Sequence, residues 1–356
     1  MKKKKFTKHL LEWFAESHRP LPWKDTKDAY LIWLSEIILQ QTRVEQGLPY
    51  FERFREKYPT VRDLANAPED EVMRMWEGLG YYSRARNLHF TAKHIADDLE
   101  GKFPDTHAGI LALKGVGDYT AAAIGSFAYD LPYAVVDGNV YRVLSRYFGE
   151  ETPIDTTQGK KLFAALADEL LDKKNPAQYN QAIMDFGATH CKPKQPLCTA
   201  CLMKNDCVAF AENMVGLLPI KSKKLKKVSR YFHYLVLNEG EYVWLRKRGA
   251  GDIWQNLYDF PLVEKEKTLS LSELEQTDEW LSFFPKKNIH IKKVSRPFGQ
   301  TLTHRKIIAV FVELDVDENF EGEKHGFVQV ARMDFDNYAF PRILNDYLKD
   351  EVLELF

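Results

Sequence analysis

Residues 113–121 read LKGVGDYTA and separate two stretches in which apolar residues recur every three or four positions. This periodicity predicts a helix on each side of a short turn. Gly115 and Gly117 permit a tight turn with positive φ and expose backbone N–H groups at the start of the second helix. Such a turn can bind a phosphate group, although a Gly-Val-Gly sequence alone is more often an ordinary helix–helix connection.

The helical pattern extends outward from this turn over residues 7–215 and predicts an all-α domain. Residues 221–230 then contain six basic side chains and no acid, which is typical of a linker. Beyond it, β-rich runs at 231–237, 242–248 and 307–314 and a helical pattern at 342–356 predict a smaller α+β domain.

Composition agrees with two domains. The chain has 356 residues, of which 45% are hydrophobic, enough to form two cores. Its formal net charge is −1, so a nucleic-acid partner would have to be bound by local patches and backbone donors. The basic start is followed by no apolar segment, and no run of 18 apolar residues occurs, so we expect a soluble, cytoplasmic protein with no membrane partner.

All cysteines of the chain lie within one short window, with the spacing C-x6-C-x2-C-x5-C: Cys191, Cys198, Cys201 and Cys207. A disulfide framework would instead connect distant loops, so the clustering favours metal ligation in a reducing compartment. The spacing by itself suits a structural zinc ion and a [4Fe-4S] cluster equally.

This cysteine spacing at the end of a helical domain, together with the hairpin, resembles the endonuclease III superfamily of DNA glycosylases. Within it, LSEIILQQT at residues 34–42 closely matches the signature of the MutY family. The resemblance implies a helix-hairpin-helix fold in which the four cysteines hold a non-catalytic [4Fe-4S] cluster. It also implies that Gly115, Val116 and Gly117 bind DNA.

The resemblance further implies the domain plan. An all-α glycosylase domain is expected at 1–216, with a six-helix barrel at about 30–135 and a cluster subdomain formed by 1–29 and 136–216. A basic linker at 217–229 leads to a Nudix-like domain at 230–356. That domain lacks the glutamate-rich metal box of Nudix hydrolases, so we expect no triphosphate hydrolysis.

Two carboxylates are the candidate catalytic groups. Glu36 lies at the border of the apolar arc of a helix predicted at 28–41, where a glutamate is usually only solvated; it matches the catalytic glutamate of the MutY family. Asp137 precedes a predicted helix and could be only an N-cap; it matches the superfamily's catalytic aspartate. Removal of adenine requires one group that donates a proton and one that stays charged, so we assign Glu36 as general acid and Asp137 as the anion beside the cationic sugar. By resemblance, Tyr119 and Asn139 complete this shell by hydrogen bonding.

Tyr119 also predicts the reaction type. Relatives that cut the DNA backbone have a lysine there, which forms a Schiff base with the sugar. Because tyrosine has no amine, we expect base removal without efficient strand cleavage.

Two further segments are predicted to contact DNA. Residues 78–88, GLGYYSRARNL, match the family motif in which Leu79 and Tyr81, with Gln41, contact the helix beside 8-oxoguanine; a core-packing role is the alternative. In the second domain, Leu302, Thr303 and His304 stand where the family has a Phe-Ser-His loop that recognises 8-oxoguanine. Leucine for phenylalanine changes the apolar contact, whereas the hydroxyl and the imidazole are kept.

Taken together, the sequence predicts a monofunctional, monomeric DNA glycosylase of base excision repair. It would hydrolyse the N-glycosyl bond of adenine paired with 8-oxoguanine or guanine in duplex DNA and leave an abasic site. Three alternatives stay open: an endonuclease III-like lyase acting on oxidised pyrimidines, a thymine glycosylase acting on G·T mismatches, and a non-catalytic DNA-binding protein with a structural metal.

Overall fold

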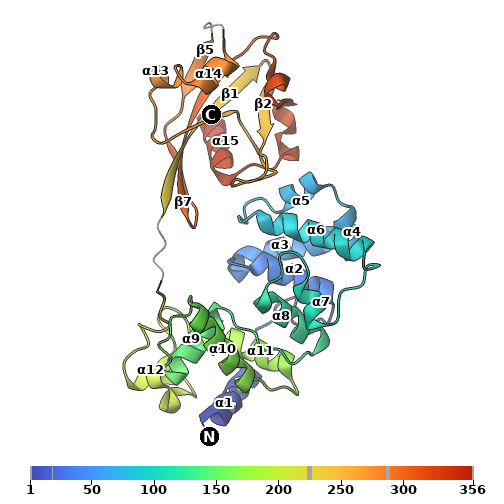
Figure 1. The fold of residues 1–356 in the computed structure, drawn as a ribbon, viewed down its shortest axis with the longest axis vertical. Coiled ribbons are helices and arrows are strands. Elements are labelled where there is room, and N and C mark those ends of the chain that lie inside the picture. Colours follow the sequence, from blue (N-terminus) through green and yellow to red (C-terminus); the bar gives the residue numbers. More distant parts are fainter. Residues whose placement is uncertain (1, 18, 223–226, 286–288, 355–356) are drawn as a thin grey trace. The chain divides into compact units, whose positions relative to one another are not determined.

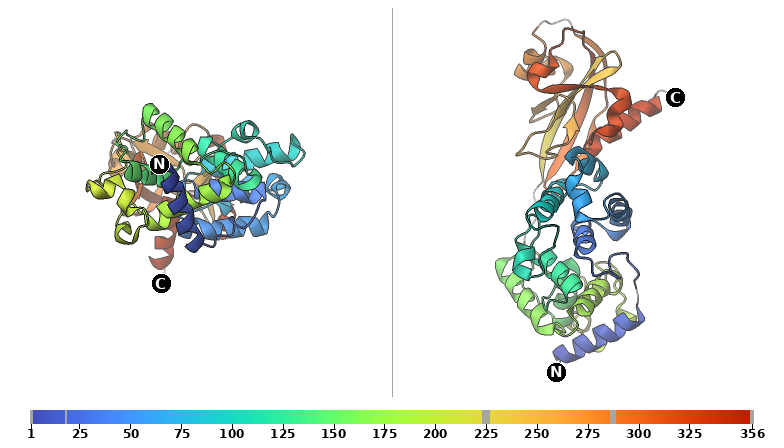
Figure 2. Two further views of the ribbon diagram at one scale, coloured as in Figure 1. Left: turned by 90° about the horizontal axis from the view of Figure 1, so that it is seen from below. Right: turned by 90° about the vertical axis from the view of Figure 1, so that its right-hand side faces the viewer.

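The computed structural model describes residues 2–17, 19–222, 227–285 and 289–354; for residues 351–354 it describes the backbone only. It contains two compact units, whose elements are shown in Figures 1 and 2. The first is built from residues 1–66 and 87–224, and the second from 67–86 and 225–356, in each case where they are described. Among the described residues, no helix combines the length and apolar character needed to cross a bilayer.

The first unit is helical, as predicted. Helix α6 begins in residues assigned to the second unit and continues in the first. The elements of the first unit are α1 (Lys2–Glu16), α2 (Ala29–Leu39), α3 (Val44–Lys57), α4 (Val61–Asn66), α6 (Ser83–Asp97), α7 (His107–Leu111), α8 (Asp118–Tyr129), α9 (Gly138–Phe148), α10 (Thr157–Leu170), α11 (Pro176–Asp185), the π-helical turn η1 (Phe186–His190), the 3-10 turns η2 (Cys198–Ala200) and η3 (Lys204–Asp206), and α12 (Val208–Ala211).

Helix α2 is the centre of this unit. Asp28 caps it by accepting a hydrogen bond from the Tyr30 N–H at 2.8 Å. The helix is buried on nearly all sides, as expected for one that is apolar all round. It packs against α8, whose run of alanines from Ala121 to Ala123 allows close approach of the two backbones. This packing brings Glu36 on α2 next to Tyr119 on α8.

The second unit is built around one mixed β-sheet. Its central strands β1 and β7 are parallel, with Val228 opposite Arg305 and Asn238 opposite Asp315. The elements are α5 (Glu69–Met75), β1 (Val228–Glu239), β2 (Tyr242–Lys247), β3 (Tyr258–Asp259), β4 (Leu262–Lys265), α13 (Leu271–Leu274), α14 (Asp278–Phe283), β5 (His290–Val294), β6 (Phe298–Thr301), β7 (Arg305–Asp315), η4 (Gly322–His325), β8 (Phe327–Ala331), η5 (Arg332–Asn337) and α15 (Arg342–Glu354). The main order is β3-β2-β1-β7-β5, and β4, β6 and β8 pair with β1, β7 and β2.

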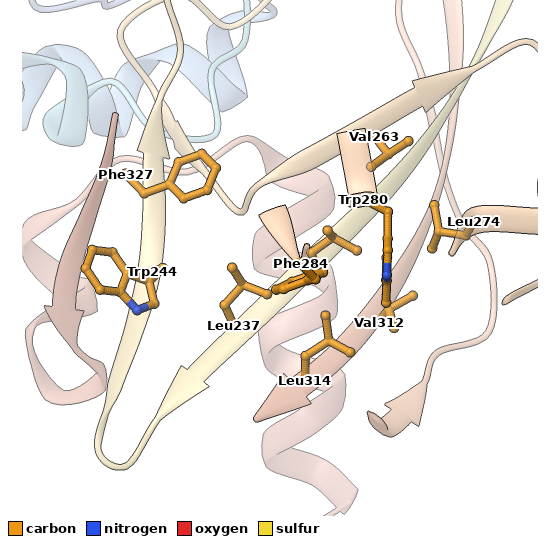
Figure 3. Packing of buried hydrophobic residues seen from close by; sticks show 10 residues of the cluster. Leu237, Trp244, Val263, Leu274, Trp280, Phe284, Val312, Leu314 and Phe327 are labelled. Atoms are coloured by element: carbon orange, nitrogen blue, oxygen red, sulfur yellow. The ribbon is translucent and has the colours of Figure 1, made fainter. Parts of the chain in front are cut away.

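Side chains alternate between the two faces of the sheet along each strand. Apolar side chains of β7 therefore point to both faces, and each face is covered by a helix. On one face, Val312 and Leu314 of β7 join an apolar cluster with Trp280 of α14, as Figure 3 shows. On the other face, the Phe311 ring stacks on that of Tyr347 from α15, with centroids 3.9 Å apart. The predicted α+β character of this region is confirmed, although β1 starts at Val228, inside the predicted linker.

Candidate active site

Glu36 and Tyr119 form a buried hydrogen-bonded pair. Glu36 is only 6% exposed, which excludes the solvated-edge alternative. The Tyr119 hydroxyl donates to Glu36 Oε2 at 2.8 Å. The pKa of Glu36 is raised to about 7, chiefly by burial; the hydrogen bond from Tyr119 acts in the opposite direction, and the negative charge of Asp137 adds a smaller upward shift. The carboxyl is therefore protonated in about half of the molecules at neutral pH.

Asp137 has a different environment, because it caps α9. Its Oδ1 accepts hydrogen bonds from the N–H groups of Asn139 and Val140, both at 2.8 Å, and its Oδ2 accepts from Asn139 Nδ2 at 2.7 Å. Burial raises the pKa of Asp137, and these three donors and the charge of Arg142 counteract the shift. These donors favour the carboxylate form of Asp137.

Asn139 is in turn held by Arg142, whose Nη2 donates to Asn139 Oδ1 at 2.8 Å. The same guanidinium donates to the carbonyl oxygens of Gly187 at 2.7 Å and Cys191 at 2.8 Å. The side chains at the start of α9 are thus fixed by the backbone of the segment that carries the first cysteine.

Glu36, Tyr119, Asp137 and Asn139 line one cleft of about 960 Å³, a size common for small-molecule sites. Several residues that the sequence reasoning missed line it too: Arg19, Leu21, Trp23, Lys24 and Asp185.

Asp185, Lys24 and Arg19 form a further group of charged side chains in this cleft. Asp185 is 4% exposed, the Lys24 ammonium is hydrogen-bonded to its carboxylate, and Arg19 lies 3.8 Å away. Trp23 is nearly buried beside them. Trp23 and Lys24 belong to a proline-rich loop without helical periodicity, so only the pairing of an aromatic with nearby cations could have indicated them.

The Gly-Val-Gly turn is present, but its two glycines differ. Gly115 has φ +83°, as predicted for the turn, and an added Cβ would lie 2.9 Å from Asn87 Cβ. Gly117 has φ −105° and forms the N-cap of α8 in extended conformation, so the expected positive φ is wrong there. Val116 is nearly buried, and its N–H donates to the Leu113 carbonyl oxygen. Gly117 lines the cleft, whose wall the turn therefore joins.

Gln41 lies outside the helix predicted for it. Helix α2 ends at Leu39, and Gln41 adopts φ +55° in the turn that follows. Gln41 is exposed and lines the cleft.

In the second unit, the segment 78–82 forms a tight loop. Leu79 is 6% exposed, whereas Tyr81 is 43% exposed and has φ +48°. The buried Arg84 guanidinium donates to the Gly80 carbonyl oxygen at 3.2 Å and lies over the Tyr81 ring. The Leu79 side chain is thus packed against the protein, whereas the Tyr81 ring is partly exposed.

Leu302, Thr303 and His304 form the turn between β6 and β7. The turn closes through a 2.8 Å hydrogen bond from the Leu302 N–H to the Arg305 carbonyl oxygen. Leu302 and Thr303 are half-buried and His304 is exposed. The hydroxyl groups of Thr303 and Tyr81 are hydrogen-bonded to each other, so the two segments predicted to contact the lesion meet within the second unit.

The four cysteines are free and half-buried, and they line a common pocket with Arg146. Arg146 Nη1 lies 3.5 Å from Cys191 Sγ. Burial raises the pKa of the Cys201 thiol to about 11, so a bound metal would displace a proton from this thiol. Within the described residues, no three His, Cys, Asp or Glu side chains are arranged around a single metal ion.

Comparison with known proteins shows the family of the chain. It is 32% identical to adenine DNA glycosylase of Buchnera aphidicola subsp. Acyrthosiphon pisum in an alignment 361 residues long, which covers 99% of each chain. This chain belongs to the adenine DNA glycosylase family. The adenine DNA glycosylase of Homo sapiens is 41% identical over 57% of this chain and 39% of its own length.

The domain families agree with this membership. Residues 34–169 match the HhH-GPD superfamily of base excision DNA repair proteins, and residues 233–350 match the NUDIX domain. Among solved structures, a thermostable thymine-DNA glycosylase superimposes with a TM-score of 0.55 at 31% identity, over 59% of this chain and 97% of that one. An endonuclease III–DNA complex shares the fold at 22% identity with a TM-score of 0.53, over 60% of this chain and 98% of that one. The predicted fold class is confirmed, and the chain is a DNA glycosylase.

Proposed function

We propose that this protein is a monofunctional glycosylase that hydrolyses the N-glycosyl bond of adenine paired with 8-oxoguanine or guanine. The observation that carries the proposal is the pair of carboxyl groups in one cleft: Glu36, with a pKa of about 7, and Asp137 at a helix N-terminus. Carboxyl groups in such unlike environments can act as acid and anion at the same pH.

In the proposed reaction, protonated Glu36 donates its proton to N7 of the extruded adenine. The bond between C1′ and N9 breaks, and its electron pair leaves with the base. The Asp137 carboxylate stabilises the cationic sugar. Glu36, now ionised, accepts a proton from the water that adds to C1′. Asn139 holds Asp137 in place, and neutral Tyr119 orients Glu36, since burial raises the pKa of Tyr119 well above its ordinary value.

The missed residues support adenine over thymine as the base. Trp23 offers an aromatic surface, and Asp185 offers a buried carboxylate that can accept a hydrogen bond from an exocyclic amino group. Thymine has no amino group to donate. We therefore infer that Asp185, held by Lys24 and Arg19, contributes to the selection of adenine.

We propose that the turn 115–117 binds a DNA phosphate, and that Gln41, Leu79 and Tyr81 contact the duplex where the base is extruded. Leu302, Thr303 and His304 would contact 8-oxoguanine. Thr303 and His304 supply polar groups for the lesion, and the Thr303–Tyr81 hydrogen bond supports a joint action of the two segments. The corresponding domain plan is a glycosylase domain at 1–216 and a lesion-recognition domain at 230–356.

We further propose that Cys191, Cys198, Cys201 and Cys207 hold a [4Fe-4S] cluster. The four thiols share one pocket, and the Arg146 guanidinium beside Cys191 suits negatively charged thiolates. The cluster would order the segment 191–207. Iron and sulfide content together with visible absorption would support this assignment, and stoichiometric zinc without iron would contradict it.

The function is tested by single-turnover incubation with a duplex that contains adenine opposite 8-oxoguanine, analysed with and without hot alkali. We expect cleavage at the adenine mainly after alkali, because the abasic site is left intact. Parallel duplexes carry a G·T mismatch and an oxidised pyrimidine. Inactivity on adenine with alkali-independent cutting at the pyrimidine would refute the proposal, as would selective release of thymine.

A further inference from the structure

Lys114, the residue before Gly115, has its ammonium group over an exposed aromatic ring. Its Nζ lies 4.0 Å from the centroid of Phe90 on α6. Phe90 is 53% exposed, and Lys114 is also exposed. An ammonium group at this distance is attracted to the negative face of the ring.

The backbone of Lys114 is fixed by the same helix. Thr91 Oγ1 donates to the Lys114 carbonyl oxygen at 2.9 Å, and Gly115 packs against Asn87 so closely that a Cβ would meet it at 2.9 Å. Asn87, Phe90 and Thr91 are spaced i, i+3 and i+4, so they share one face of α6. This face holds the turn and orients the lysine.

The position suits a DNA phosphate. Gly117, Asp118 and Tyr119, which follow in the same turn and helix start, line the cleft of Glu36 and Asp137. A DNA strand that places a base in this cleft must therefore pass close to the turn. Exposed Asp118 would repel its phosphates, and Lys114 supplies the compensating charge.

We propose that Lys114 is a phosphate-binding residue and that Phe90 is the platform that orients it. The ring occupies one side of the ammonium group, and the opposite side binds a phosphate oxygen of duplex DNA. The contact is independent of base sequence and of damage. The inference rests on the proposed function only in taking duplex DNA as the ligand.

The test measures equilibrium binding of the full-length protein to an undamaged duplex. Binding is monitored by fluorescence anisotropy at salt concentrations between about 50 and 200 mM. For Lys114→Met we expect the slope of log K against log salt to be smaller by about 0.9, which corresponds to one phosphate contact. The advantage of the wild-type protein should then fall about three- to fourfold across this salt range.

Two variants make the result specific. Lys173→Met removes another exposed lysine, which lies beyond the end of α10 and pairs with Asp168 at 3.2 Å, and should leave the slope unchanged. Phe90→Leu keeps the charge, so the slope should be retained while affinity falls by up to about fivefold. A Lys114→Met slope equal to that of the wild type and of Lys173→Met would overturn the proposal.

The readout does not depend on catalysis. If the protein releases no adenine but Lys114→Met still has the smaller slope, only the proposed function is contradicted. Normal adenine release with an unchanged slope in Lys114→Met would contradict only the role of Lys114.

Discussion

The pKa of Glu36 allows a quantitative prediction of the pH dependence of base release. With a pKa of about 7, half of the Glu36 carboxyls are protonated at pH 7, compared with roughly one in 300 for a glutamate at its ordinary pKa of 4.5. If protonated Glu36 is the acid, the single-turnover rate should be constant at low pH and fall about tenfold per pH unit well above 7. Glu36→Gln cannot donate this proton, so its rate should fall by at least about a hundredfold while DNA affinity is retained.

The same shift predicts a change in stability. Because Glu36 binds its proton more tightly in the folded state, the wild-type protein loses stability as pH rises from about 4.5 to 7, and the loss is complete above 7. The difference of about 2.5 pKa units corresponds to about 3 kcal/mol. Neutral Glu36→Gln avoids this loss, so its free energy of unfolding at pH 8 should exceed that of the wild type by up to about 3 kcal/mol.

The assays are single-turnover base release from pH 5 to 9 and urea unfolding at pH 5 and pH 8. Glu45→Gln is the matched control, because Glu45 is an exposed glutamate that lines the same cleft. It should change neither the profile nor the stability. A wild-type rate that is flat between pH 6 and 9, or near-normal turnover by Glu36→Gln, would refute the assignment of Glu36 as general acid.

Three further predictions concern the sugar, the lesion and the second core. Tyr119→Lys places an amine beside the sugar, so borohydride should trap a covalent protein–DNA adduct; absence of an adduct would argue that Tyr119 lies elsewhere in the complex. Leu302→Phe should increase the preference for 8-oxoguanine over guanine opposite adenine by about two- to tenfold through aromatic contact, measured as the ratio of single-turnover rates, and an unchanged ratio would count against this turn as the reader. Phe311→Ala should lower the stability of the second unit by about 3–5 kcal/mol in urea unfolding, because Phe311 is fully buried against Tyr347; a loss below 1 kcal/mol would contradict the packing.

The sequence by itself determined the helical class of residues 7–215, the α+β class of the region after the linker and the identity of the principal candidate residues. These features depend on local periodicity, on Gly and Cys spacing, and on short motifs around Glu36, Tyr119 and Asp137. Such signals are contained within a few consecutive residues. The end of α2 was predicted two residues too late, at Gln41 instead of Leu39. The turn that contains Gln41 follows directly after the apolar helix, and the periodicity does not mark this boundary.

Only the tertiary structure decided that Glu36 is buried and paired with Tyr119, 83 positions away. It also decided that Asp185 joins Lys24 and Arg19 in the same cleft, and that Leu79 is buried whereas Tyr81 is exposed. Burial and pairing across helices depend on how α2, α8 and α11 pack, and no single segment records that packing. Because the pKa of a carboxyl is set by its solvation and its neighbouring charges, the acid–base roles that we propose rest on the fold and not on the motif alone.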